Sequence, residues 1–147
     1  MKHLLIIAGV AVVALLTASG IRGIRNNNWL NIKFDPDNDF IGQTGYDSKG
    51  FARFSHPIYS LRAGFRLLNT YKQKGIDTIE SIITRFAPST ENPTTEYIKT
   101  VSKLTGISPS STITAFEWPR VLQAMVKVEV GKSVPIDRFY QAQQMAF

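Results

Sequence analysis

Residues 118–131 read WPRVLQAMVKVEVG, and this stretch combines a helical pattern with one misplaced charge. Leu122, Met125, Val126 and Glu129 recur at i, i+3, i+4 and i+7, the spacing of one helix face that turns toward a core. Gly131 suits the position just after a helix end. The pattern therefore predicts a core helix whose last turn carries a carboxylate on its apolar side.

That carboxylate, Glu129, is expected to hold its proton. Poor solvation and the negative end of the helix dipole both disfavour the charged form and raise a carboxyl pKa. A carboxylic acid that is protonated near neutral pH is what glycosidic bond cleavage needs as its general acid. The alternative, which spacing alone favours, is that Glu129 bends to the surface or pairs with a nearby Lys or Arg.

Length and composition limit the other possibilities. A chain of 147 residues fits one domain. Its 17 Lys and Arg outnumber its 11 Asp and Glu but form no run, so no nucleic-acid partner is expected. A diffuse positive field suits an anionic polymer such as a bacterial cell wall, or a membrane surface. With no cysteine and only His3 and His56, neither a metal nor a cofactor is expected.

The N-terminus carries an apolar run, Leu4–Ile21, which is followed by Arg22 and Arg25. Eighteen residues of helix span about 27 Å, close to the hydrocarbon thickness of a bilayer. A cleaved signal peptide is the alternative, but the basic residues after the run favour an uncleaved anchor. We therefore expect residues 1–22 to be a transmembrane anchor or signal segment, and residues 23–147 to form the domain.

The rest of the chain is predicted to be mainly α-helical. Residues 26–56 are rich in Asn, Asp, Gly and aromatics, which indicates loops with one short hairpin. Further helices are expected at Pro57–Gly75, after a capping box at Asp77-Thr78-Ile79-Glu80, at about Thr95–Leu104, and from Pro135 with Phe139 and Met145 packed inward. Ser55-His56-Pro57 is expected to begin the first of these helices as an N-cap.

One spacing is typical of a calcium loop but is incomplete. Asp35, Asp37 and Asp39 alternate as the first ligands of such a loop do. Phe40 replaces the glycine that the sharp turn requires, and no Glu stands at the twelfth position. Calcium binding is therefore not expected.

Eight short segments, in order, resemble the lysozyme-like lytic proteins carried in phage particles, whose best-known members belong to membrane-containing phages. They are GIRNNN at 23–28, NIK at 31–33, GQTG at 42–45, FARF at 51–54, LRA at 61–63, LLNTY at 67–71, APSTEN at 87–92 and TEYI at 95–98. One departure is Trp29-Leu30, where the family usually has Pro-Gly.

The N-terminal half is also similar to flagellar-type glucosaminidases and lytic transglycosylases. In those enzymes a helix ending in the acidic Glu precedes the Asn-rich and Gln-Gly loops, whereas here the similar helix comes last. A circular permutation would still bring Glu129 to a groove between Asn27–Asn31 and Gln43–Gly45. The expected fold class is thus mainly α, a lysozyme-like (lytic transglycosylase-like) domain with this permutation and an N-terminal transmembrane helix.

The resemblance implies a virion-associated enzyme that cleaves peptidoglycan during phage entry or exit, as a lytic transglycosylase or a muramidase. Glu129 is the expected general acid, with Glu91 as the next candidate carboxylate, although Glu91 is as well explained by helix capping. A transglycosylase needs only one carboxylate, which fits a lone Glu129. Candidate substrate-binding residues, each also explicable as a turn or packing residue, are Asn27, Asn31, Gln43, Thr44 and Tyr97.

The expected partners are peptidoglycan, a lipid membrane and other virion proteins, with the protein anchored in a virion or host envelope membrane. Two alternatives remain open. A catalytically inactive, membrane-anchored structural protein of a virion is favoured by the Trp29-Leu30 departure and the missing second carboxylate. A peptidoglycan-binding module without turnover would bind cell walls and release no fragments.

Overall fold

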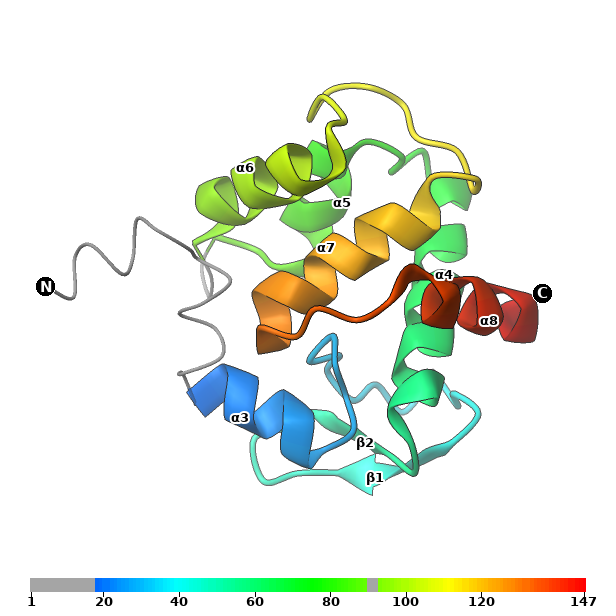
Figure 1. The fold of residues 1–147 in the computed structure, drawn as a ribbon. Helices are drawn as coiled ribbons and strands as arrows, with labels where there is room; N and C mark the ends of the chain where they lie inside the picture. The colour runs from blue at the N-terminus through cyan, green and yellow to red at the C-terminus, as the bar shows by residue number, and fades with distance from the viewer. Residues whose placement is uncertain (1–17, 90–92) are drawn as a thin grey trace, which may run out of the picture.

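The computed structural model describes residues 18–89 and 93–147, which form a set of packed helices with one small hairpin at the edge of the fold (Figure 1). The elements in chain order are α3 (Ala18–Arg25), β1 (Gln43–Tyr46), β2 (Ala52–Phe54), α4 (Pro57–Gln73), α5 (Ile79–Phe86), α6 (Thr94–Thr105), α7 (Trp118–Val130) and α8 (Ile136–Ala146). The mainly helical content and the single short hairpin agree with the sequence prediction.

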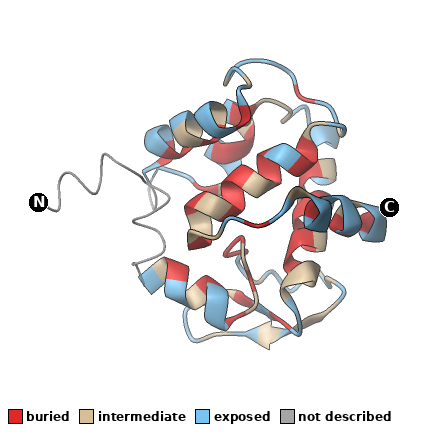
Figure 2. Ribbon diagram, in the orientation of Figure 1, coloured by how far each residue is buried: buried red, intermediate tan, exposed pale blue. Residues whose placement is uncertain are grey.

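Helix α7 lies at the centre of the fold and packs against α3, α4, α6 and α8 (Figure 1). Its predicted inner face is confirmed, because Leu122, Met125 and Val126 are all buried (Figure 2). Pro119 occupies its first turn, and the helix ends at Gly131, whose φ of 76° is the left-handed conformation that glycine adopts without strain.

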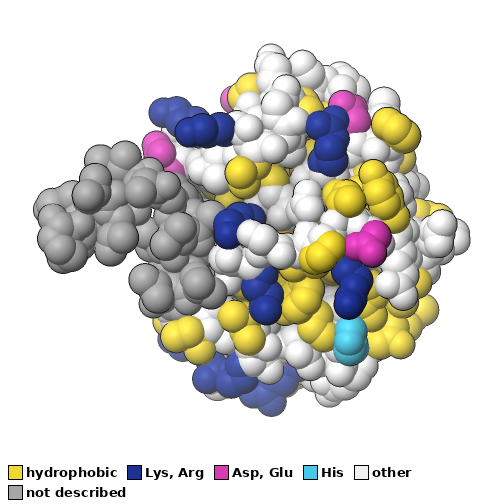
Figure 3. Space-filling model, viewed as in Figure 1, with side chains coloured by type: hydrophobic (Ala, Val, Ile, Leu, Met, Phe, Trp, Pro, Cys, Tyr) yellow, Lys and Arg dark blue, Asp and Glu magenta, His cyan; other side chains and the backbone are white. Residues whose placement is uncertain are grey.

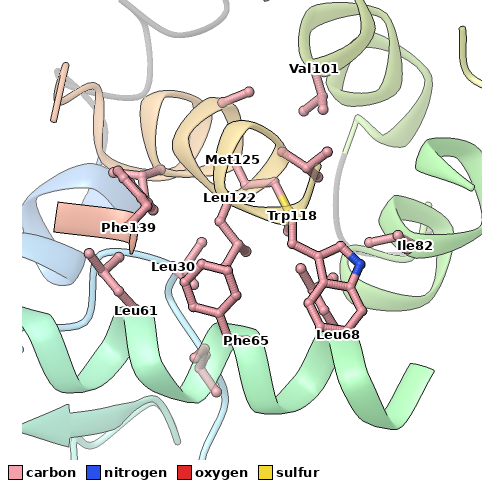
Figure 4. Packing of buried hydrophobic residues seen from close by; sticks show 14 of the residues in the cluster. Leu30, Leu61, Phe65, Leu68, Ile82, Val101, Trp118, Leu122, Met125 and Phe139 are labelled. Atoms are coloured by element: carbon pink, nitrogen blue, oxygen red, sulfur yellow. The ribbon is translucent and has the colours of Figure 1, made fainter. Parts of the chain in front are cut away.

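The core beneath α7 explains the Trp29-Leu30 departure. Leu30 is fully buried among Leu61, Phe65 and Leu122 (Figure 4). A Cβ on Gly64 of α4 would lie only 2.5 Å from Leu30 Cδ1, so the glycine provides the space that this leucine fills. The Trp29-Leu30 pair therefore anchors the loop in the core.

Local capping accounts for the starts of α4 and α5. His56 Nδ1 accepts a hydrogen bond from the Ile58 N–H at 3.1 Å, so the predicted N-cap is confirmed. The capping box of α5 joins Thr78 and Ser81, not the predicted Asp77 and Glu80, because the Ser81 hydroxyl accepts from the Thr78 N–H.

The last helices follow the prediction with one error. Helix α6 runs one residue beyond the predicted Leu104, to Thr105, and the predicted stop at Gly106 is confirmed by the left-handed conformation of that residue. In α8, Phe139 is buried as expected. Met145 is exposed, so its predicted packing role is wrong; its carbonyl instead accepts a hydrogen bond from Arg62 Nε at 3.1 Å.

The Asn-rich loop is fixed to the hairpin by side-chain amides. Strands β1 and β2 pair antiparallel, with an irregular register between Gln43 and Gly45. Buried Asn28 donates to the carbonyls of Ile32 and Ala52 at 2.9 and 2.8 Å and accepts from the Ile32 N–H at 2.9 Å. A buried amide with both groups bonded makes this loop rigid.

The predicted fold class requires a correction at the N-terminus. Across 18–89 and 93–147, no helix has both the length and the apolar character needed to cross a membrane. The end of the predicted apolar run, Ala18–Ile21, instead opens the eight-residue helix α3, which packs on α7 and crosses the predicted boundary at residue 22. The rest of that run, residues 4–17, lies outside the described residues. The fold class supported here is a mainly helical domain with a two-stranded sheet.

Candidate active site

Glu129 stands in the last turn of α7 with its side chain partly buried at the wall of a cleft. The Asn31 side-chain nitrogen lies 3.2 Å from Glu129 Oε1 and donates a hydrogen bond to it. The two residues are 98 positions apart in the sequence. The fold thus brings Glu129 to the Asn27–Asn31 loop, as predicted, whereas no residue of the predicted Gln43–Gly45 side of the groove lines this cleft.

Three features fix the position of Asn31: its backbone conformation, a hydrogen bond to α3, and the close packing of α3 on α7. Its φ of 48° is left-handed, a conformation that Asn tolerates better than most residues. The same side-chain nitrogen donates to the Ser19 carbonyl on α3 at 3.1 Å. A Cβ on Gly23 of α3 would come within 2.4 Å of Val130 Cγ1 and 3.0 Å of Asn31 Oδ1. The close approach of α3 to α7 therefore depends on a glycine and positions the Glu129 partner.

Tyr97 of α6 approaches Glu129 from the other side. It is buried, and its hydroxyl is close enough to perturb the pKa of Glu129 and to be perturbed in return. No partner within ordinary hydrogen-bond geometry satisfies that hydroxyl among the described residues.

The environment of Glu129 raises its pKa to about 7. Loss of solvent around the carboxylate is the main cause. The interactions with Asn31, Tyr97 and Arg22 act in the opposite direction, because each favours the charged form. The balance leaves a carboxyl that exchanges its proton near neutral pH, as the sequence predicted. Burial raises the pKa of Tyr97 well above its ordinary value, and the neighbouring Glu129 adds to that rise.

The cleft beside Glu129 has a volume of about 550 Å³. Four aromatic side chains line it, contributed by the 33–36 loop, the end of the hairpin turn, α4 and α5: Phe34, Phe51, Tyr71 and Phe86. Polar groups come from Ser19, Asn31 and Asn38. A mixed lining of aromatic faces and amides suits sugar rings, which present apolar faces and hydroxyl groups together.

Arg22 supplies a positive charge close to Glu129 within this cleft. Its guanidinium carbon lies 3.7 Å from the centre of the Phe51 ring. Its Nε is buried with no hydrogen-bond partner among the described residues. Stacked on an aromatic ring and close to Glu129, this cation lowers the pKa of Glu129 and helps to hold the carboxylate once the proton has left.

The other predicted substrate-binding residues are not among the residues that line the cleft. Asn27 has a φ of 52° and donates its side-chain amide to the Phe54 carbonyl at 3.1 Å. Gln43 and Thr44 belong to β1, where they contact Asn38 and Arg53 through weak hydrogen bonds of 3.4 Å. Substrate contacts for these three residues remain predictions. Glu91 lies outside the described residues.

Asp35 is a carboxylate that the sequence reasoning did not place at the site. It lines the same cleft as Glu129, and its Oδ1 accepts a hydrogen bond from the Asp37 N–H at 2.9 Å. The alternating Asp spacing drew attention to calcium, and only the fold brings this loop to α7. Among the described residues, no group of three His, Cys, Asp or Glu side chains is placed to hold a metal ion.

Comparison with known proteins gives one informative match. No family model matches the chain. The chain is 39% identical over 129 residues to "Protein P5" of Pseudoalteromonas phage PM2, an alignment covering 85% of this chain and 81% of that protein. The match supports the phage part of the predicted resemblance and does not extend to lysozyme-like or lytic transglycosylase proteins.

Proposed function

This chain belongs to the family of Protein P5 of Pseudoalteromonas phage PM2, and we propose that it is a virion-associated enzyme that cleaves peptidoglycan glycan strands during phage entry or exit. One observation supports this proposal above all others. A partly buried carboxyl with a pKa of about 7 opens into a cleft of ligand size, where an amide orients it. A general acid is most effective when its pKa is close to the working pH.

In the proposed reaction, protonated Glu129 gives its proton to the glycosidic oxygen while the bond from that oxygen to the sugar C1 breaks. The resulting Glu129 carboxylate then accepts the proton of the muramyl 6-hydroxyl. The oxygen of that hydroxyl attacks C1 and closes a 1,6-anhydro ring. Glu129 ends protonated and no water is consumed, so one carboxylate is sufficient for the whole cycle.

Hydrolysis is the second candidate, because Asp35 provides a further carboxylate on the same cleft. In that reaction a water molecule attacks C1 and gives its proton to a carboxylate base, and the product carries a reducing end. Glycosidases that work in this way separate their two carboxyl groups by about 6.5–9.5 Å, which leaves room for the water. The mass of the product distinguishes the two routes, since the anhydro product is lighter by one water.

The test is digestion of purified sacculi by the full chain, followed by mass analysis of the released muropeptides. Loss of the general acid in Glu129→Gln should lower the rate by about 10²–10⁴-fold. The matched control is Glu96→Gln, since Glu96 is exposed on α6 and forms an ion pair with Lys99 at 3.8 Å. Equal release by wild type and Glu129→Gln would refute the assignment of Glu129.

Release of no fragments by the folded wild type would favour the alternative of a structural virion protein. Binding of the protein to sacculi without release would favour a peptidoglycan-binding module. The proposed partners are accordingly peptidoglycan and the neighbouring proteins of the virion.

A further inference from the structure

A second hollow of about 630 Å³ adjoins the Glu129 cleft. The two hollows share four lining residues, Asp35, Asn38, Leu67 and Tyr71, so they lie side by side on the surface. A polymer bound over Glu129 can therefore extend into the second hollow. We propose that this hollow, the charged groove, binds the zwitterionic stem peptide of peptidoglycan, an inference that rests on the proposed function.

One wall of the charged groove is acidic. It is formed by the loop of residues 35–39, in which Asp35, Asp37 and Asp39 are all exposed. Asp35 accepts the Asp37 N–H and shapes the turn. In the part of the chain that the structure describes, the carboxylates of Asp37 and Asp39 take no hydrogen bond and no ion pair, which leaves them available to a cationic group.

A second wall is basic and comes from two helices. Arg62, Arg66 and Lys74 recur at multiples of four along α4 and its C-cap, and Arg85 joins them from α5. Arg62 and Arg66 donate to the carbonyls of Met145 and Ala146, each at 3.1 Å, so they also hold the end of α8. Lys74 and Arg85 are exposed, and Arg85 lies 5.9 Å from the centre of the Tyr71 ring.

The two walls do not neutralise each other. Within 18–89 and 93–147, no ion pair joins an acidic residue of the groove to a basic one. Opposite charges that face a shared hollow without pairing suit a ligand that carries both signs. The glycan strand itself is nearly uncharged, whereas a stem peptide of the diaminopimelate type carries free carboxylates and a free amine. The peptide is therefore the part of the substrate that fits this groove.

The basic residues elsewhere on the surface are spread over several elements, as one face shows (Figure 3). General attraction to an anionic wall would not require an acidic wall in the groove. The acidic side is what distinguishes peptide recognition from simple attraction to negative charge.

The test compares two soluble probes, a disaccharide that carries a diaminopimelate tripeptide and the same disaccharide with its lactyl carboxyl capped as a simple amide in place of the peptide. Binding is measured by NMR titration of the full chain with Glu129→Gln, which prevents turnover. We expect the peptide-bearing probe to bind about fivefold or more tightly. The pair Asp37→Asn and Asp39→Asn, and separately the pair Lys74→Ala and Arg85→Ala, should abolish this preference and leave the bare probe unaffected. Lys99→Ala on α6 is the control.

Equal binding of both probes by the unmodified groove overturns the inference. Loss of the preference in the Lys74→Ala and Arg85→Ala pair, with no loss in the Asp37→Asn and Asp39→Asn pair, also overturns it, because the groove would then recognise only negative charge. Digestion by the wild type separates this inference from the proposed function. Cleavage of peptide-free and intact glycan strands at the same rate would retain the function and reject the peptide site. Absence of cleavage, together with a charge-dependent preference for the peptide probe, would retain the peptide site and reject the function.

Discussion

The carboxyl of Glu129 and the amide of Asn31 form the central pair at the scale of single residues. Glu129 was predictable because one charge interrupts an apolar helical stripe. The identity of its partner was not, since the contact spans 98 positions and depends on a left-handed residue. Asn31 was expected to bind substrate; the structure places its amide against the Glu129 carboxyl, and a sugar contact remains a prediction.

The stability of the protein should depend on pH through Glu129. Its folded-state pKa of about 7 lies above the unfolded value of ~4.3, so the folded state binds this proton more tightly. The stabilising contribution is complete below about pH 4 and is lost as the pH rises to 7. Relative to Glu129→Gln, the wild type should lose roughly 3 kcal/mol of unfolding free energy between pH 4 and 8, measured by urea denaturation. Parallel curves for the two proteins would contradict the raised pKa.

Asn31→Gly should raise the pKa of Glu129 further. Glycine keeps the left-handed backbone and removes the amide that stabilises the carboxylate. Asn27→Gly is the matched control, because Asn27 has a φ of 52° but bonds to the Phe54 carbonyl. Carbon-13 NMR titration of the Glu129 carboxyl would measure both variants. A downward shift in Asn31→Gly, or equal shifts in the two, would count against the proposed role of Asn31.

At the scale of elements, the sequence was most informative where helices are periodic and capped. Helices α4, α6 and α7 lie close to their predicted limits, because apolar spacing and terminal Pro or Gly mark them locally. Helix α3 was missed because the apolar run before it continues into its first residues. What decides its position is close packing of Gly23 on α7, a tertiary contact that composition does not reveal.

Gly23→Ala should separate α3 from α7. The added Cβ would lie 2.4 Å from Val130 Cγ1 and 2.8 Å from the Asn28 carbonyl, so the helices must move apart. We expect a loss of about 1–3 kcal/mol in unfolding free energy. The neighbouring Ile24→Ala, on the exposed side of α3, should change it by only about 0.5 kcal/mol or less. Thermal denaturation compares the two variants. A Gly23→Ala variant as stable as the wild type would show that the close contact between α3 and α7 does not require glycine at this position.

At the scale of the whole molecule, the cleft is assembled from distant parts of the chain. Helix α3, the 31–38 loop, α4, α5 and α7 each contribute lining residues. Sequence patterns predicted most of these elements. They did not predict that the elements come together around one cleft, because loop closure and packing angles are set by the complete core. For the same reason Asp35 was recognised only as part of an Asp-rich loop, and the charged groove was not foreseen.

The most direct test of the account is the pH dependence of muropeptide release by the full chain, measured beside the titration of the Glu129 carboxyl. If Glu129 donates the proton, kcat/KM should fall above about pH 7, and the midpoint of that fall should coincide with the pKa seen by NMR. The account would be contradicted if kcat/KM did not change over the pH range in which Glu129 titrates, or if the pKa of Glu129 lay in the ordinary carboxyl range.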